Sequence, residues 1–220
     1  MRLGLDVLSI KPRYRSSYNG VIVRAADRIT TMSPFFYAQY KKDAFTFKAK
    51  TILAQGGEHL NLMSGYAISS KVDGVRYDYT PYTTSSSWVN FTYGKDIQGV
   101  LLLGYMKNFG TTKTLIGYNE EVVQTALIYG DPEVILKATH SQLDKTAIFF
   151  NKNAWNINQM FRVAPNLLYN YGKLTLGLEY ELTGVQYGSK QYINLENGLA
   201  DVDTHWVSNH RVTFMTKLSF

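Results

Sequence analysis

The sequence of 220 residues contains no cysteine and only 5 prolines. Without cysteine, the chain can form no disulfide framework, no thiolate zinc site and no cysteine nucleophile. The sequence also lacks any stretch of about 18 uncharged apolar residues, which excludes a membrane-spanning helix. A strand of an outer-membrane barrel needs only about 9–11 residues of alternating polarity, so the lack of a long apolar run does not exclude a barrel.

Charge and histidine content exclude further classes of protein. The formal charge of +6 comes from 23 basic and 17 acidic residues, but the basic residues form no run and match no nucleic-acid-binding module, so we expect no nucleic-acid partner. His59, His140, His205 and His210 lie far apart without ligand spacing, so we expect no metal site. No catalytic constellation is visible, and we predict neither an enzyme nor a cofactor.

The residues that are abundant favour β-structure at a membrane. The chain has 17 Tyr and 11 Phe, which suit strands, and Tyr also suits a membrane–water boundary. Polarity alternates with a period of two, most clearly near the end of the chain, where one face carries Val212, Phe214, Thr216, Leu218 and Phe220. An apolar face opposite a polar face is typical of a strand between lipid and a water-filled lumen, although a soluble sandwich shows the same alternation.

Turn spacing favours a barrel over a sandwich. Three tight-turn sequences, residues 41–43, 94–96 and 171–173, contrast with two long polar connections, residues 108–156 and 184–205. Bacterial barrels have short turns on one side of the membrane and long loops on the other. We count three strands between the first two turns, and an odd number cannot return the chain to the same side. Either one strand is misassigned or one short turn faces outward.

These patterns predict one all-β domain, residues 1–220, as an antiparallel transmembrane β-barrel with roughly eight to ten strands present. Residues 60–69 and 75–86 supply further β-structure, and we expect two more strands before Thr30. Pro165 predicts a bulge or an unpaired position in the strand that contains it. Asp6 places a charge where a signal peptide would be apolar, so we expect a chain that is either processed or truncated.

The final strand predicts a barrel-assembly signal. Outer-membrane barrels commonly end in an aromatic residue that closes an alternating strand, and their assembly machinery recognises this element. Phe214, Leu218 and Phe220 form this signal here, and we expect them to face outward while Arg211 and Lys217 face the interior. A one-residue slip would place Lys217 in hydrocarbon at a cost of about 2–4 kcal/mol.

Several segments together resemble a known family. Residues 87–95 (SWVNFTYGK), 104–111 (GYMKNFGT), 162–166 (RVAPN), 169–173 (YNYGK) and 178–183 (LEYELT) resemble the DcaP-like porins, particularly those of Bacteroidetes. Gly65-Tyr66-Ala67, Asn209-His210-Arg211 and the terminal Phe220 match in the same order. The resemblance implies a homotrimeric porin of the bacterial outer membrane, with lipid around it, that passes small, often anionic, solutes through a larger barrel. Porins of this family are considerably longer, so the resemblance also implies that residues 1–220 are the C-terminal part of a longer protein.

Charged residues on the strand faces assigned to the lumen are the candidate functional residues. They are Lys48, Lys50, Arg162, Glu179, Glu181, Arg211 and Lys217. An excess of basic side chains in a pore favours anions, so the sequence predicts a passive channel with weak anion preference. A plainer interpretation is that these charges solvate the interior and pair with one another. The alternative function is an outer-membrane barrel enzyme or surface-binding protein that acts through its outward loops.

Overall fold

The computed structural model describes residues 1–11, 16–18, 21–23, 28–60, 62–72, 76–115, 140–142, 148–150, 156–189 and 192–219. Almost all regular structure in these residues is β-strand, apart from one 3-10 turn, η1 (Gly57–Leu60). The strands are β1 (Arg2–Ile10), β2 (Ser16–Tyr18), β3 (Val21–Val23), β4 (Ile29–Lys42), β5 (Phe45–Gln55), β6 (Gly65–Val72), β7 (Arg76–Gly94), β8 (Ile97–Thr111), β9 (His140–Gln142), β10 (Ile148–Phe150), β11 (Ile157–Tyr171), β12 (Leu174–Tyr187), β13 (Tyr192–Asn194) and β14 (His205–Leu218). No helix among the described residues is long and apolar enough to cross a membrane.

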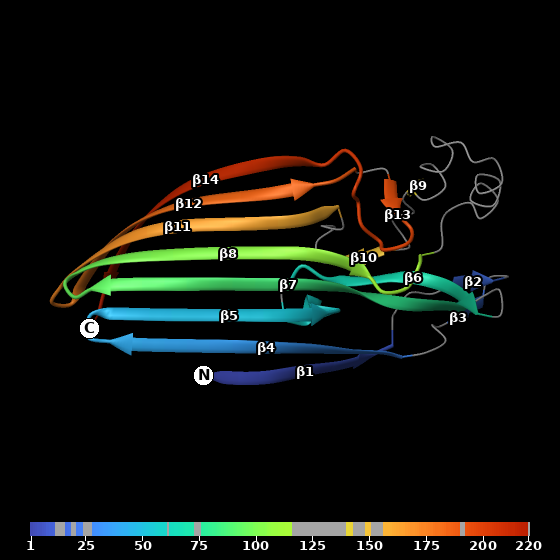
Figure 1. The fold of residues 1–220 in the computed structure, drawn as a ribbon, viewed down its shortest axis with the longest axis horizontal. Coiled ribbons are helices and arrows are strands. Elements are labelled where there is room, and N and C mark those ends of the chain that lie inside the picture. Colours follow the sequence, from blue (N-terminus) through green and yellow to red (C-terminus); the bar gives the residue numbers. More distant parts are fainter. Residues whose placement is uncertain are drawn as a thin grey trace.

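The predicted fold class is confirmed. Eight strands form one antiparallel path in the order β1-β4-β5-β7-β8-β11-β12-β14, and β6 and β10 join its side through β7. The sheet curves across this path, and β1 and β14 are its two edges, so the described strands form an open, curved wall (Figure 1). A wall of this kind is consistent with part of a barrel.

The three short turns are correctly predicted and lie together at one end of the sheet (Figure 1). Each contains a residue in the left-handed region: Asp43 with φ 50, Gly94 with φ 121 and Gly172 with φ 56. Positive φ allows a strand to reverse within two residues, and glycine adopts it without steric cost. We call this end of the sheet the short-turn end.

The odd strand count is explained by a strand that is interrupted. β5 pairs with residues 83–93 of β7, and β6 pairs with residues 76–81 of the same strand. β5 and β6 therefore run in the same direction along successive parts of the 19-residue β7. β5 and β6 together lead away from the short-turn end, and β7 returns to it. The turns before β5 and after β7 therefore both lie at the short-turn end.

Several boundaries differ from those predicted. Before Thr30 the main sheet holds one strand, β1, and the pair β2 and β3 forms a separate two-stranded sheet. Residues 76–94 form one continuous strand, which includes most of the predicted stretch 75–86. Register does not shift at Pro165, so it is no bulge, although pairing to β12 passes from Val163 to Asn166. The missing N–H of proline accounts for this unpaired position.

Register sorts the strand residues onto two faces. Residues directly opposite each other in neighbouring strands share a face, and successive residues of one strand alternate. We call the side that includes Lys48, Arg162 and Arg211 the charged face, and the side that includes Phe47 and Leu103 the apolar face. Both names are kept below for the eight-strand path.

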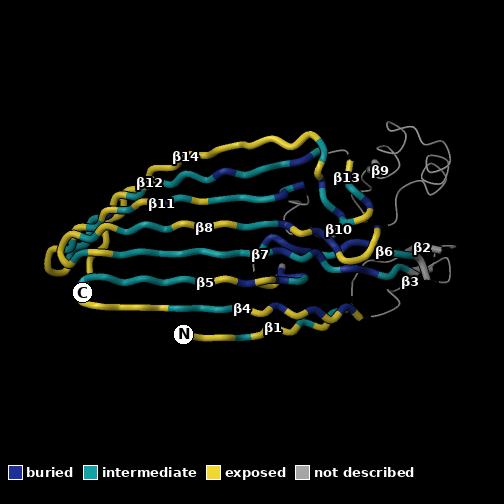
Figure 2. Tube along the Cα trace, in the orientation of Figure 1, coloured by how far each residue is buried: buried dark blue, intermediate teal, exposed yellow. Residues whose placement is uncertain are grey.

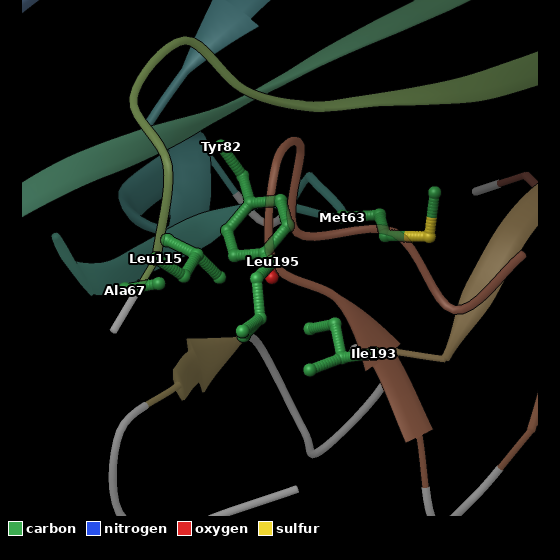
Figure 3. Packing of buried hydrophobic residues seen from close by; sticks show 6 residues of the cluster. All are labelled: Met63, Ala67, Tyr82, Leu115, Ile193 and Leu195. Atoms are coloured by element: carbon green, nitrogen blue, oxygen red, sulfur yellow. The ribbon is translucent and has the colours of Figure 1, made fainter. Parts of the chain in front are cut away.

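Buried residues concentrate at the end opposite the short turns (Figure 2). One cluster there consists of Met63, Ala67, Tyr82, Leu115, Ile193 and Leu195. Its side chains come from the segment before β6, from β6 and β7, from the segment just after β8, and from the connection around β13 (Figure 3). Packing in this molecule therefore concentrates where a long connection folds back onto strand ends, while the wall itself is one sheet thick.

Candidate functional site

All seven charged candidate residues lie on one face of the sheet. Adjacent-strand pairing connects Arg211 with Glu181 and Lys217 with Thr175, and Arg162 with Gly104. It continues from Gly104 through Trp88 to Lys50. The strand register therefore places all seven residues on one face, as the sequence predicts. The assignment of that face to a lumen stays a prediction.

Six of the seven candidates fall in three successive cross-strand rows. One row contains Lys50, Trp88, Gly104 and Arg162, and the next contains Lys48, Glu181 and Arg211. Glu179 follows in the third row, opposite Thr213. Rows on one face are two residues apart, about 7 Å, so these charges occupy a narrow band across the wall. Lys217 lies outside this band, toward the short-turn end.

Two carboxylates and two guanidinium groups form a connected cluster within this band. Arg211 Nη2 donates to Glu181 Oε2 at 2.9 Å and lies 3.6 Å from Glu179 Oε1. Arg162 Nη1 lies 3.6 Å from Glu181 Oε2, and Arg162 Nε donates to Thr183 Oγ1 at 3.2 Å. Of the two arginines, Arg211 makes the shorter contact with Glu181. Positions 179, 181 and 211 are register neighbours, which only the strand pairing reveals.

The three candidate lysines make no ion pair among the described residues. Lys50 Nζ instead lies 5.6 Å from the centre of the Phe35 ring, over its face. Such a cation–π contact turns the Lys50 ammonium group toward β4. Lys48 and Arg162 remain the basic side chains next to the centre of the charged face. The cluster around Glu181 cancels, so the band keeps a net positive charge.

A hollow of about 610 Å³ opens over the centre of the wall. Most residues around it belong to the charged face. They are Lys48, Ser86, Ser87, Trp88, Asn90, Leu102, Gly104, Tyr105, Met106, Met160, Phe161 and Arg162. Apolar side chains at its base and cations at its rim make this hollow suitable for a small solute with both an apolar part and a negative charge.

The apolar face is almost free of charge. Along the described part of the eight-strand path, its only charged residues are Lys42, beside a short turn, and Lys107, near the opposite end. Large apolar side chains between them are exposed, for example Leu167 at 55%, Leu178 at 53% and Phe214 at 69%. An exposed apolar surface of this extent on a soluble protein would be a liability for aggregation. Contact with lipid or another apolar surface removes that cost.

Aromatic residues mark both ends of the apolar face. Tyr40, Phe45, Tyr93, Tyr169 and Tyr171 lie toward the short-turn end. Tyr105, Phe161 and Trp206 lie toward the other end, where the rings of Phe161 and Trp206 are 5.6 Å apart. Aromatic residues are enriched at both membrane–water interfaces of transmembrane barrels.

The connection from β12 to β14 folds back onto the charged face. Tyr82 lies on that face by alternation along β7, and its hydroxyl donates to the Gly198 carbonyl at 2.7 Å. Thr111 N donates to Asn197 O at 2.6 Å, and Asn158 Nδ2 donates to Ala200 O at 2.8 Å. We call residues 192–204 the folded-in segment. Sequence reasoning missed it, because its anchoring residues come from β7, β8 and β11 and become neighbours only in the folded sheet.

Of the three residues of the assembly signal, two can be placed on a face of the sheet and one cannot. Phe214 and Leu218 share the apolar face of β14, opposite Arg211 and Lys217, as the alternation predicts. Phe220 lies outside the described residues, so its orientation stays a prediction. β14 has a partner only on the β12 side within the described strands.

The described histidines make separate contacts. His59 Nε2 lies 2.8 Å from Asp6 Oδ2, and His210 Nδ1 lies 2.6 Å from the Tyr180 hydroxyl. His205 stands at the start of β14, at the end away from the short turns. Within the described parts of the chain, no three His, Asp or Glu side chains gather as a metal-binding group.

Fold and surface together define a class: an open, curved antiparallel β-sheet with one apolar face and one charged face. Comparison with known proteins goes no further, since no family model, no curated protein and no solved structure matches the chain.

Proposed function

We propose that this chain forms the C-terminal part of a porin-like channel of the bacterial outer membrane, which passes small anionic solutes by passive diffusion. The observation that carries the proposal is the contrast between the two faces of one eight-strand path: charge is nearly absent from one and gathers in a band on the other. A transmembrane barrel with a water-filled interior requires this contrast. The resemblance to the DcaP-like porins agrees with it.

Strand length supports the proposal. On β8, the apolar face runs without charge from Ile97 to Tyr105, which is about 27 Å at roughly 3.4 Å per residue. A tilted transmembrane strand needs about 9–11 residues, and the segment from Ile97 to Tyr105 reaches the lower end of that range. The proposal thus places the short turns on the periplasmic side and the long connections outside.

The edges of the wall set a requirement on the complete channel. Unpaired backbone groups inside a bilayer cost several kcal/mol each, so β1 and β14 need neighbouring strands in the membrane. Further strands of a larger barrel would supply these neighbours, inserted by the outer-membrane assembly machinery, and the resemblance implies three such barrels per particle.

Reconstitution of the complete protein tests the proposal. Liposomes that contain it should swell in isosmotic small sugars and dicarboxylates, and a planar bilayer should show discrete conductance steps. Control liposomes should carry the same protein after heat denaturation. Folded protein that is inserted but leaves liposomes impermeable would contradict the channel, and would favour an enzyme or surface-binding protein that acts through its outward loops.

A further inference from the structure

Among the described strand glycines of the charged face, Gly104 alone has open space above it. The Phe35 ring covers Gly4, and the Phe161 ring covers Gly184. Gly177 lies under Leu168, whose Cδ2 would be 2.9 Å from an added Cβ. At Gly104 an added Cβ would meet only Arg162 Cβ, at 3.7 Å. The space above Gly104 is therefore open, although its register partner Trp88 is large enough to fill it.

Trp88 is held beside this space and not over it. The ring of Tyr37 contacts Trp88 edge-on, with 6.4 Å between centroids and 61° between planes. Trp88 therefore borders the hollow while Gly104 forms its floor. An indole next to a flat glycine floor offers a surface on which a planar apolar group can stack.

Two cations border the same hollow from opposite sides. Lys48 lies on β5 and Arg162 on β11, three strand spacings or about 14 Å apart at the backbone. Long side chains from these positions can converge over the two central strands, β7 and β8. Arg162 shares its charge with Glu181, 3.6 Å away, while Lys48 makes no ion pair among the described residues. The hollow thus carries close to one uncompensated positive charge.

We propose that this hollow, which we call the Gly104 hollow, is a binding site for a small, flat, singly charged anion such as an aromatic carboxylate. The apolar ring lies over Gly104 against Trp88, and the carboxylate lies between Lys48 and Arg162. The site rests on the proposed function in one respect only, because access for the solute requires the charged face to be water-filled. Binding itself does not require conduction.

Titration with benzoate in detergent tests the ligand class. Folded protein should bind benzoate at millimolar concentration. Binding is measured by the quenching of tryptophan fluorescence, and this quenching should be lost in Trp88→Phe. Acetate lacks the ring, benzyl alcohol lacks the charge and benzylamine has the opposite charge, so each should bind at least tenfold more weakly. Equal affinity for benzoate and benzyl alcohol, or for benzoate and acetate, would overturn the proposal without any variant.

A matched pair of glycine variants tests the position. Gly104→Leu fills the hollow and should weaken benzoate binding at least tenfold. Gly99→Leu is the control, because Gly99 lies on the same strand with no atom within 4 Å of an added Cβ, but on the apolar face. Lys48→Met should weaken benzoate binding and leave benzyl alcohol unchanged. Benzoate binding that survives in Gly104→Leu would place the site elsewhere.

Conductance separates this inference from the proposed function. A protein that conducts but shows no benzoate preference refutes the Gly104 hollow as a site and leaves the channel intact. A protein that binds benzoate in the expected pattern but neither swells liposomes nor conducts refutes the channel and leaves the site intact.

Discussion

The two faces of the wall share the same strands, yet they differ in whether their side chains have partners within the protein. On the charged face, Glu181 lies between two arginines and the folded-in segment satisfies strand-end groups such as the Tyr82 hydroxyl. On the apolar face, large side chains such as Phe214 stay exposed at 69% with no protein layer above them. Several polar groups of the charged face thus have partners within the protein, while the large side chains of the apolar face have no protein layer to pack against. Such a division suits a wall between lipid and water.

The largest effect should come from a charge placed on the wrong face. Leu103 and Leu102 are adjacent in the middle of β8, on the apolar and charged faces respectively. If lipid covers the apolar face, Leu103→Arg should lower the free energy of unfolding from a bilayer by about 2–4 kcal/mol. Leu102→Arg should change it by about 1 kcal/mol or less, as for an exposed substitution.

Denaturant titration of both variants folded into phospholipid vesicles measures this contrast. The same titration in detergent micelles serves as the reference for the effect of the bilayer. Equal destabilisation of the two variants in vesicles would mean that lipid does not discriminate between the faces.

How far the sequence could go is clearest in β14. Its alternation between Arg211, Thr213, Lys217 and the apolar residues between them sufficed to predict the two faces, because period two is a local property. The short turns were equally local, since Gly94 and Gly172 carry the required positive φ. The same reasoning could not detect that β5 and β6 share β7, because that depends on which residues pair across the sheet.

The candidate site, like the fold, was predictable only in those features that depend on local sequence. Charged residues could be assigned to one face, but their grouping into adjacent rows required the register of six strands. The Gly104 hollow depends on where the Trp88 ring turns, which no spacing encodes. The folded-in segment depends on contacts between residues more than 100 positions apart, such as Tyr82 and Gly198.

The next largest effect on stability concerns the end of the sheet opposite the short turns, where the folded-in segment covers the charged face. The Tyr82 hydroxyl is fully buried and donates to Gly198 O, whereas the exposed Tyr105 hydroxyl donates to Gln159 Oε1 at 2.6 Å. Tyr82→Phe leaves a buried carbonyl without its donor and should cost about 1–2 kcal/mol. Tyr105→Phe returns Gln159 to solvent and should cost about 0.5 kcal/mol or less. Thermal unfolding in detergent compares the two, and a larger loss for Tyr105→Phe would reverse the interpretation of the folded-in segment.

A smaller effect is expected from the carboxylate between the arginines. The Glu181 side chain is only 12% exposed and contacts both Arg211 and Arg162. Glu181→Gln keeps the shape but removes the charge, so we expect a loss of about 0.5–1 kcal/mol, decreasing with added salt. Glu196→Gln is the control, because Glu196 is exposed in the folded-in segment and makes no ion pair among the described residues. Identical, salt-independent values for both variants would show that the cluster contributes nothing measurable.

The smallest effect, on ion selectivity, tests the charge difference between the faces directly. Five basic and two acidic candidate residues lie on the charged face, so the complete protein should favour chloride over potassium by a factor of about two at low salt. Lys48→Glu and Arg162→Glu should each shift the reversal potential toward cations, because both residues border the Gly104 hollow. Lys217→Glu should shift it least. Lys217 lies six residues beyond Arg211 on β14, about 20 Å along the strand, and screening at physiological salt acts over about 8 Å. Reversal potentials in planar bilayers under a potassium chloride gradient measure all three. A cation-selective wild type would contradict the assignment of this face to the pore, and a shift in Lys217→Glu as large as in Arg162→Glu would move the narrowest part of the conduction path to the short-turn end.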